Sequence, residues 1–197
     1  MSADQISLTD DQPTRGWKQR VTGPLIVGAT VLAAALLGIA LRPVGLLSAF
    51  WPANAVLLGL MVRWPRLAGP FGWAAALAAY IAADLATGGA LVRTLALTTI
   101  NLTGVMSGFL LLRRLHADDL TLRKPTSVIL VTSMVALASV TAGLAGAASH
   151  PLLFRGDPSF GVFFYWAATE LANFMIILPV MLTAPDRFEP GAWERTR

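Results

Sequence analysis

Six apolar stretches dominate the sequence, and they constrain its fold more than any other feature. They cover residues 24–41, 46–62, 68–86, 94–112, 126–148 and 162–184. A helix that crosses a bilayer needs roughly 17–25 mostly apolar residues. Charged residues make up only 13% of the chain, against about 25% in soluble domains. The sequence therefore predicts an all-α, polytopic transmembrane helix bundle of about six spans. Stretch 46–62 is short and contains Pro52, so a bent or re-entrant helix is the alternative there.

The basic residues predict the orientation of this bundle. Twelve of the 15 Lys and Arg residues lie in the two tails and in the connections at 63–66 and 113–124. The other three are Arg42, Arg93 and Arg155. Positively charged connections stay in the cytoplasm, so both termini are expected inside a bacterial inner membrane. The expected parts are an N-terminal tail (1–23), a membrane domain (24–184) and a C-terminal tail (185–197) that is a candidate link to an output domain.

Composition also excludes several classes of protein. The chain has no cysteine, so disulfides, zinc–thiolate sites and iron–sulfur clusters are excluded. It has only two histidines, His116 and His150, and no nucleotide loop or hydrolase motif. We therefore expect no enzymatic activity, no cofactor and no metal. The net charge of +4 is not gathered into a basic stripe with interleaved aromatics, so no nucleic-acid partner is expected.

Small residues recur at helical spacing in two of the stretches. Gly104 and Gly108 form a GxxxG motif, and Gly143 lies four residues from both Ser139 and Ala147. Such residues let helices approach closely in a membrane, where lipid is as apolar as leucine. We expect them to pack helices of the same chain, and a homodimer face is the alternative.

Polar residues within the apolar stretches are the candidate functional residues. An ionisable group at the bilayer centre costs at least about 2.5–3.5 kcal/mol unless it is paired or hydrated. Asn54, Asn101 and Glu170 lie seven or eight residues from the expected outer ends of their spans. At about 1.5 Å per residue, all three should reach the same depth.

The spacing of these residues extends the cluster. Trp51 should share a helix face with Asn54, Tyr80 with Asp84, and Trp166 and Asn173 with Glu170. We therefore predict a polar pocket edged by aromatics in the outer half of the bundle. Its expected members are Trp51, Asn54, Asp84, Asn101, Trp166, Glu170 and Asn173. The alternatives are that the asparagines only tie helices together, and that Asp84 only pairs with Arg93.

Glu170 is the most informative of these residues. Burial disfavours a charged carboxylate, and no Lys or Arg of the six stretches is expected at its depth, Arg93 being the nearest candidate. We expect Glu170 to be either protonated or engaged by an external cation or cationic ligand.

Three motifs resemble the bacterial membrane-associated sensor 1 (MASE1) domain. The run from Phe50 to Leu60 resembles its WPxxG-apolar opening, and the run from Asn101 to Leu115 resembles its asparagine-led helix ending in LLRR. Trp166 and Pro179 match its final helix, where Glu170 and Asn173 replace the usual Asp and Gly. The resemblance covers about residues 24–184, with about six spans where the family often has eight. It implies a sensory input domain for a cytoplasmic diguanylate cyclase, phosphodiesterase or histidine kinase.

Two other functions remain open. Intramembrane carboxylates are also typical of transporters and channel subunits, although these often show internal repeats and none is evident here. A structural subunit could recruit a partner protein through residues 113–124. That connection holds Arg113, Arg114, Arg123 and Lys124. We expect it to anchor the chain at the anionic leaflet, where each basic residue contributes about 1 kcal/mol.

Overall fold

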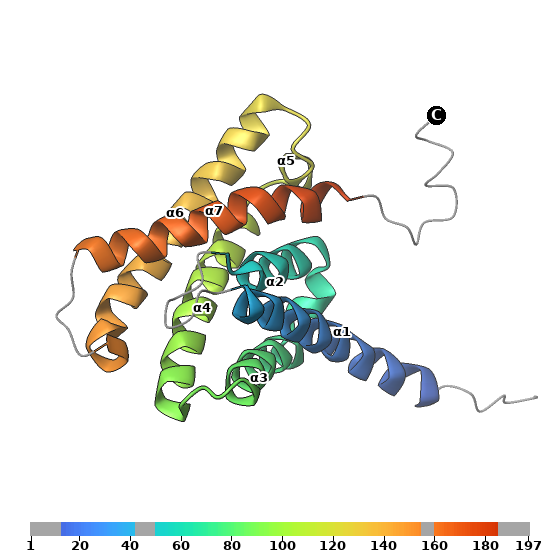
Figure 1. The fold of residues 1–197 in the computed structure, drawn as a ribbon. Coiled ribbons are helices and arrows are strands. Elements are labelled where there is room, and N and C mark those ends of the chain that lie inside the picture. The colour runs from blue at the N-terminus through green and yellow to red at the C-terminus, as the bar shows by residue number, and fades with distance from the viewer. Residues whose placement is uncertain (1–12, 42–49, 155–159, 185–197) are drawn as a thin grey trace, which may run out of the picture.

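The structure is a computed structural model and describes residues 13–41, 50–154 and 160–184. Within these ranges every regular element is a helix (Figure 1), so the expected all-α class is confirmed. The elements are α1 (Pro13–Ala40), α2 (Pro52–Arg63), the 3₁₀ turn η1 (Pro65–Ala68), α3 (Pro70–Ala86), α4 (Leu91–Leu112), α5 (Ala117–Leu120), α6 (Pro125–Phe154) and α7 (Phe160–Thr183).

Four of the described helices are long and apolar enough to cross a membrane. The qualifying segments are Val21–Ala40, Leu91–Leu112, Pro125–Pro151 and Phe160–Thr183. They correspond to the expected stretches 24–41, 94–112, 126–148 and 162–184. These four helices support a membrane protein, whereas the number of spans and the side of each terminus stay predictions.

Two further apolar helices, α2 and α3, are shorter than these four. α3 has 17 residues and α2 has 12. At about 1.5 Å per residue, α2 is about 18 Å long, short of the roughly 30 Å hydrocarbon core. Residues 50 and 51 are not helical, so the stretch 46–62 is not one continuous helix, which agrees with the alternative of a bent or re-entrant segment; residues 46–49 lie outside the described part of the chain.

Proline explains where α2 begins and ends. Trp51 precedes Pro52 and Trp64 precedes Pro65, and a residue before proline is driven away from the helical region by a steric clash. The two tryptophans have nearly the same non-helical backbone, at φ −126°, ψ 79° and φ −121°, ψ 81°. Pro52 itself is well placed in the first turn, because the N–H that it lacks would have no partner there.

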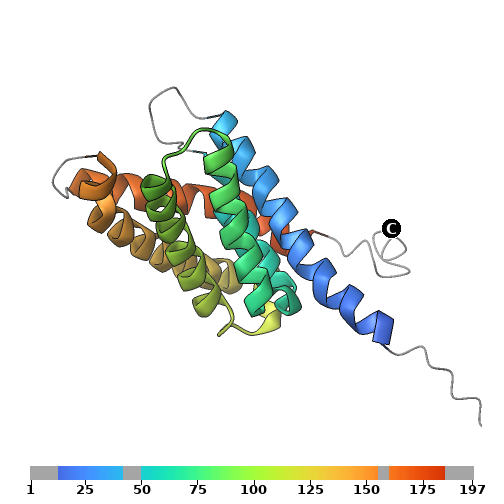
Figure 2. The same ribbon diagram turned by 90° about the horizontal axis from the view of Figure 1, so that it is seen from below.

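Helix α2 lies at the centre of the bundle. Ten of its twelve residues are buried, and α1, α4 and α7 all pack against it. Figure 2 shows α1 and α3 side by side, and Figure 1 shows α7 crossing α6. The largest fully buried side chains include Leu57, Leu58 and Met61 of α2 itself and Phe174 and Leu178 of α7. Side chains of α2 therefore contact several neighbouring helices at once.

The glycines of α4 and α6 face neighbouring helices of the same chain. A Cβ added to Gly104 would lie 3.0 Å from Ala142 Cβ, and one added to Gly108 would lie 2.9 Å from Leu58 Cδ2. A Cβ added to Gly143 would lie 2.9 Å from Phe163 Cδ2. All three glycines allow close packing inside the bundle, so the homodimer stays a prediction that these residues do not support.

Candidate ligand-binding site

A hydrogen-bond network at the centre of the bundle joins four helices. The Tyr80 hydroxyl of α3 donates to Asn54 Oδ1 of α2 at 2.7 Å. Asn54 Nδ2 donates to both carboxylate oxygens of Glu170 on α7, at 3.0 and 2.9 Å. It also lies 3.1 Å from Asn101 Oδ1 of α4. All four residues are buried, and Asn54 is the common partner of the other three.

The local sequence explains how these groups meet. Pro52 starts α2, so Asn54 lies in its first turn and near the middle of the bundle. On α4, Gly104 leaves room for the carboxylate, because a Cβ there would lie 3.0 Å from Glu170 Oε1. The same glycine that brings α4 close to α6 therefore also admits Glu170.

A pocket opens beside this network. Its empty volume is about 690 Å³, including the part open to the surroundings. Six of the seven expected site residues line it, and the seventh, Asn54, is bonded to two of them. The lining consists of Trp51, Tyr80, Asp84, Thr94, Leu97, Thr98, Asn101, Tyr165, Trp166, Thr169, Glu170 and Asn173. The structure thus brings all seven residues together.

Three further hydrogen bonds hold the edge of the pocket. The backbone N–H of Trp51 donates to Asn173 Oδ1 at 2.9 Å, and Asn173 Nδ2 donates to the Thr169 carbonyl at 2.7 Å. This asparagine ties the start of α2 to α7. Asp84 accepts a hydrogen bond from the Thr94 hydroxyl, which ties the end of α3 to α4.

The indole of Trp51 leaves a donor available beside the pocket. Its six-membered ring packs closely on Gly38 of α1, where an added Cβ would lie 3.1 Å from Cζ3. Its Nε1 is buried, and no described residue accepts a hydrogen bond from it. An unpaired buried donor is unfavourable, and it belongs to a residue that lines the pocket.

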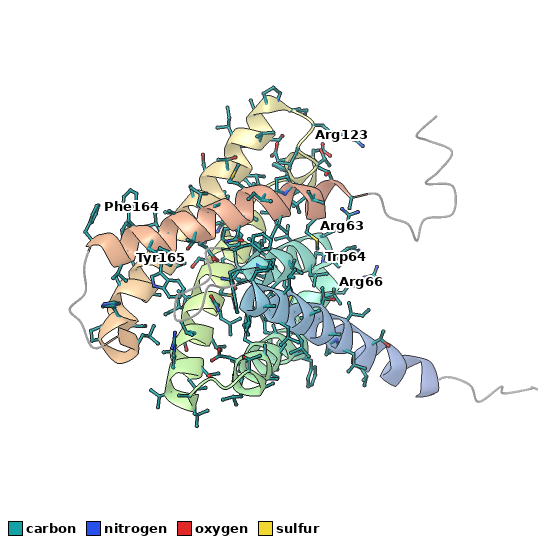
Figure 3. The ribbon with its side chains drawn as sticks, in the orientation of Figure 1. Arg63, Trp64, Arg66, Arg123, Phe164 and Tyr165 are labelled. Carbon is teal, nitrogen blue, oxygen red and sulfur yellow. The ribbon has the colours of Figure 1, made fainter. Side chains whose placement is uncertain are left out.

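The charge of the lining matches a cation. Among the described residues that line the pocket, Asp84 and Glu170 are acidic and none is Lys, Arg or His. Four are aromatic: Trp51, Tyr80, Tyr165 and Trp166, of which Figure 3 labels Tyr165 on α7. Aromatic faces attract cations. Nowhere in the described ranges do three His, Asp or Glu side chains gather as metal ligands would.

Sequence reasoning missed several members of the site. Helical spacing places Tyr80 only on the face of Asp84, and the predicted set of site residues does not include Thr94, Tyr165 or Thr169. Helical spacing offered a signal for two of them, since Tyr165 and Thr169 are four residues apart and adjoin Trp166 and Glu170. Nothing in the sequence marks Thr94 as the partner of Asp84.

Comparison with known proteins adds no assignment to this geometry. No family model, no curated protein and no solved structure matches the chain.

Proposed function

We propose that this chain is a sensory input domain of a bacterial inner membrane that binds a small organic cation around Glu170. The observation that carries the proposal is a buried carboxylate in an aromatic-walled pocket, where no basic residue lines the wall within the described part of the chain. The resemblance to the MASE1 domain supports the sensory role. The distribution of basic residues supports the orientation, with the end of α7 facing a cytoplasmic output domain.

The ligand class follows from the partners of Glu170. Both of its oxygens accept hydrogen bonds from the neutral amide of Asn54, which orients a carboxylate without cancelling its charge. A buried charge is costly unless it is paired as well as hydrogen-bonded. An ammonium group in the pocket would provide the pair, with Trp166 and Tyr165 offering aromatic faces to its alkyl substituents.

Helices α2 and α7 provide a route from this pocket to the far end of the bundle. They meet at the pocket through Asn54 and Glu170. Further along, Gly59 allows close approach, because an added Cβ would lie 2.7 Å from Met181 Cβ. At the far end Arg63 donates to the carbonyl oxygens of Met181, Leu182 and Ala184, the first two at 2.9 and 2.7 Å.

This coupling gives ligand binding a mechanical consequence. A cation that pairs with Glu170 changes the hydrogen bond between α7 and Asn54. Since Arg63 holds the last turn of α7 to the same helix α2, a displacement of α7 at the pocket must be accommodated at its end. A ligand shifts such an equilibrium only by its different affinity for the two states, and contact with Glu170 provides that difference.

Fusion of residues 1–197 to a diguanylate cyclase tests the sensory role. The purified fusion in lipid nanodiscs is assayed with choline and with its uncharged isostere, 3,3-dimethylbutan-1-ol. We expect choline alone to change cyclase activity, and Glu170→Gln to abolish the response while the protein remains inserted. Thr99→Val is the matched control, because its exposed hydroxyl bonds only to the Leu95 carbonyl of its own helix.

A second assay separates sensing from transport. Uptake of labelled choline is measured in proteoliposomes that contain the unfused chain. Sensing predicts no accumulation above empty liposomes. Accumulation that Glu170→Gln abolishes, together with an unresponsive cyclase fusion, would instead assign the pocket to a transporter.

A further inference from the structure

A second cavity lies at the opposite end of α2 from the ligand pocket. It is a groove formed where α2, α4 and α7 end and where the connection 113–124 crosses them. Its empty volume is about 2190 Å³, including the open part. We define the basic groove by its three arginines, Arg63, Arg113 and Arg123. None of the described residues that line it is Asp or Glu.

The walls between these arginines are apolar. They include Met61, Val62, Phe109, Leu115, Leu120 and Leu182. Arg63 and Arg123 flank the end of α7 (Figure 3). The guanidinium of Arg113 lies over the ring of Phe109, 5.7 Å from its centroid. The groove thus places cationic groups at the rim of an apolar surface.

The connection that carries Arg113 and Arg123 is held in place. Leu115, Leu120 and Leu122 pack against the buried core, and the Ser127 hydroxyl donates to Asp119 Oδ1 at 2.8 Å. Leu122 adopts a left-handed backbone with φ 56°, which a non-glycine residue rarely does unless its surroundings enforce it. This turn immediately precedes Arg123, which lines the groove.

Guanidinium groups match phosphate oxygens in geometry as well as in charge. The guanidinium of Arg63 lies 5.1 Å from the ring centroid of the next residue, Trp64. The Trp64 side chain is 40% exposed, as is typical of tryptophans at the membrane–water interface. A molecule that suits both the arginines and the apolar wall carries a phosphate and a hydrocarbon chain.

We propose that the basic groove binds the phosphate headgroup of an anionic membrane lipid, with Arg113 and Arg123 as its main ligands. An acyl chain would lie along Phe109 and Leu182. The proposal concerns residues outside the pocket of Glu170 and does not depend on what that pocket binds. It differs from general attraction to an anionic leaflet, because only the arginines that line the groove should matter.

Native mass spectrometry of the full chain in detergent tests this site. The protein is given equimolar phosphatidylglycerol and phosphatidylcholine, and the bound lipids are counted. Arg113→Gln/Arg123→Gln removes two charges from the groove. The matched control, Arg66→Gln/Arg114→Gln, removes two charges from exposed residues at the same end that do not line it.

We expect the wild type to bind more phosphatidylglycerol than phosphatidylcholine. In the groove variant the ratio of the two bound lipids should fall about tenfold, whereas the control variant should keep the wild-type ratio. Equal binding of both lipids by the wild type would overturn the proposal, as would equal losses in the two double variants.

Competition with glycerol 3-phosphate shows whether the groove binds the phosphate of a lipid or that of a soluble ester. Failure of this soluble ester to displace phosphatidylglycerol supports a lipid site, and full displacement would overturn it in favour of a free phosphate ester.

Discussion

Asn54 is the residue on which the pocket depends most, because one amide group is the partner of three other buried residues. Asn54→Leu keeps a similar volume but removes the acceptor of Tyr80 and the donor to Glu170. A buried polar group left without its partner costs about 1–3 kcal/mol. We expect a clear fall in the thermal unfolding midpoint in detergent.

The control for this substitution is Thr103→Val on α4, whose exposed hydroxyl bonds to the Thr99 carbonyl of its own helix. It should leave the midpoint nearly unchanged. A similar midpoint for Asn54→Leu and Thr103→Val would mean that the network does not stabilise the bundle.

Gly104 tests whether Glu170 needs a small neighbour. Its added Cβ would lie 3.0 Å from both Glu170 Oε1 and Ala142 Cβ. We expect Gly104→Ala to lower stability, because overpacking costs about 1–3 kcal/mol and outweighs the about 1 kcal/mol that alanine gains in helix propensity. Gly69→Ala is the control, since no heavy atom lies within 4 Å of its added Cβ. A gain in stability for Gly104→Ala would contradict this account.

Residue spacing predicted the cluster better than it predicted the partners within it. Counting from the ends of the apolar stretches placed Asn54, Asn101 and Glu170 at one depth, and the structure joins all three. The phenol of Tyr80 was not predicted as a member. Its partner depends on the rotation of α3 about its axis, which periodicity alone does not fix. The pairing of Asp84 with Arg93 stays a prediction.

At the scale of elements, hydropathy located the helices but misjudged α2. A hydropathy average records how apolar a segment is, and a helix buried by protein is as apolar as one that faces lipid. It also ignores the backbone, whereas Pro52 and Pro65 decide where α2 begins and ends. Hydropathy therefore identifies the stretch 46–62 as apolar, and Pro52 suggests a bent or re-entrant segment there, but neither predicts a short helix surrounded by others.

The coupling of α2 to α7 makes a prediction about Arg63. Arg63→Gln removes a charged donor from the carbonyls that end α7, and hydrogen bonds of charged groups contribute about 1.5–3 kcal/mol. We expect an altered cyclase output in the fusion, with unchanged stabilisation by choline, because Arg63 does not line the pocket.

Arg66→Gln is the control for this coupling. It removes a charge from the adjacent exposed turn, and it should change neither the cyclase output of the fusion nor the stabilisation by choline. If Arg63→Gln leaves both basal and choline-dependent cyclase activity at wild-type levels, the route through the end of α7 is wrong.

At the scale of the whole molecule, the charge distribution predicts the topology. A reporter active only in the periplasm should give a signal when fused after Arg155, and a cytoplasmic reporter when fused after Lys124. The same pair of fusions tests whether the segment 46–62 crosses the membrane. If it does not, every later element is inverted, and the two reporters would exchange their signals.

The central claim is that Glu170 forms the binding site of a cation, and ligand-induced stabilisation tests it most directly. The unfolding midpoint of purified residues 1–197 is measured against increasing choline and against 3,3-dimethylbutan-1-ol, for the wild type and for Glu170→Gln. A ligand that binds only the folded state raises stability with its concentration. We predict that choline raises the wild-type midpoint, that the uncharged isostere does not, and that Glu170→Gln folds but gains nothing from choline. Equal stabilisation of both proteins by choline, or of the wild type by both compounds, would contradict the account.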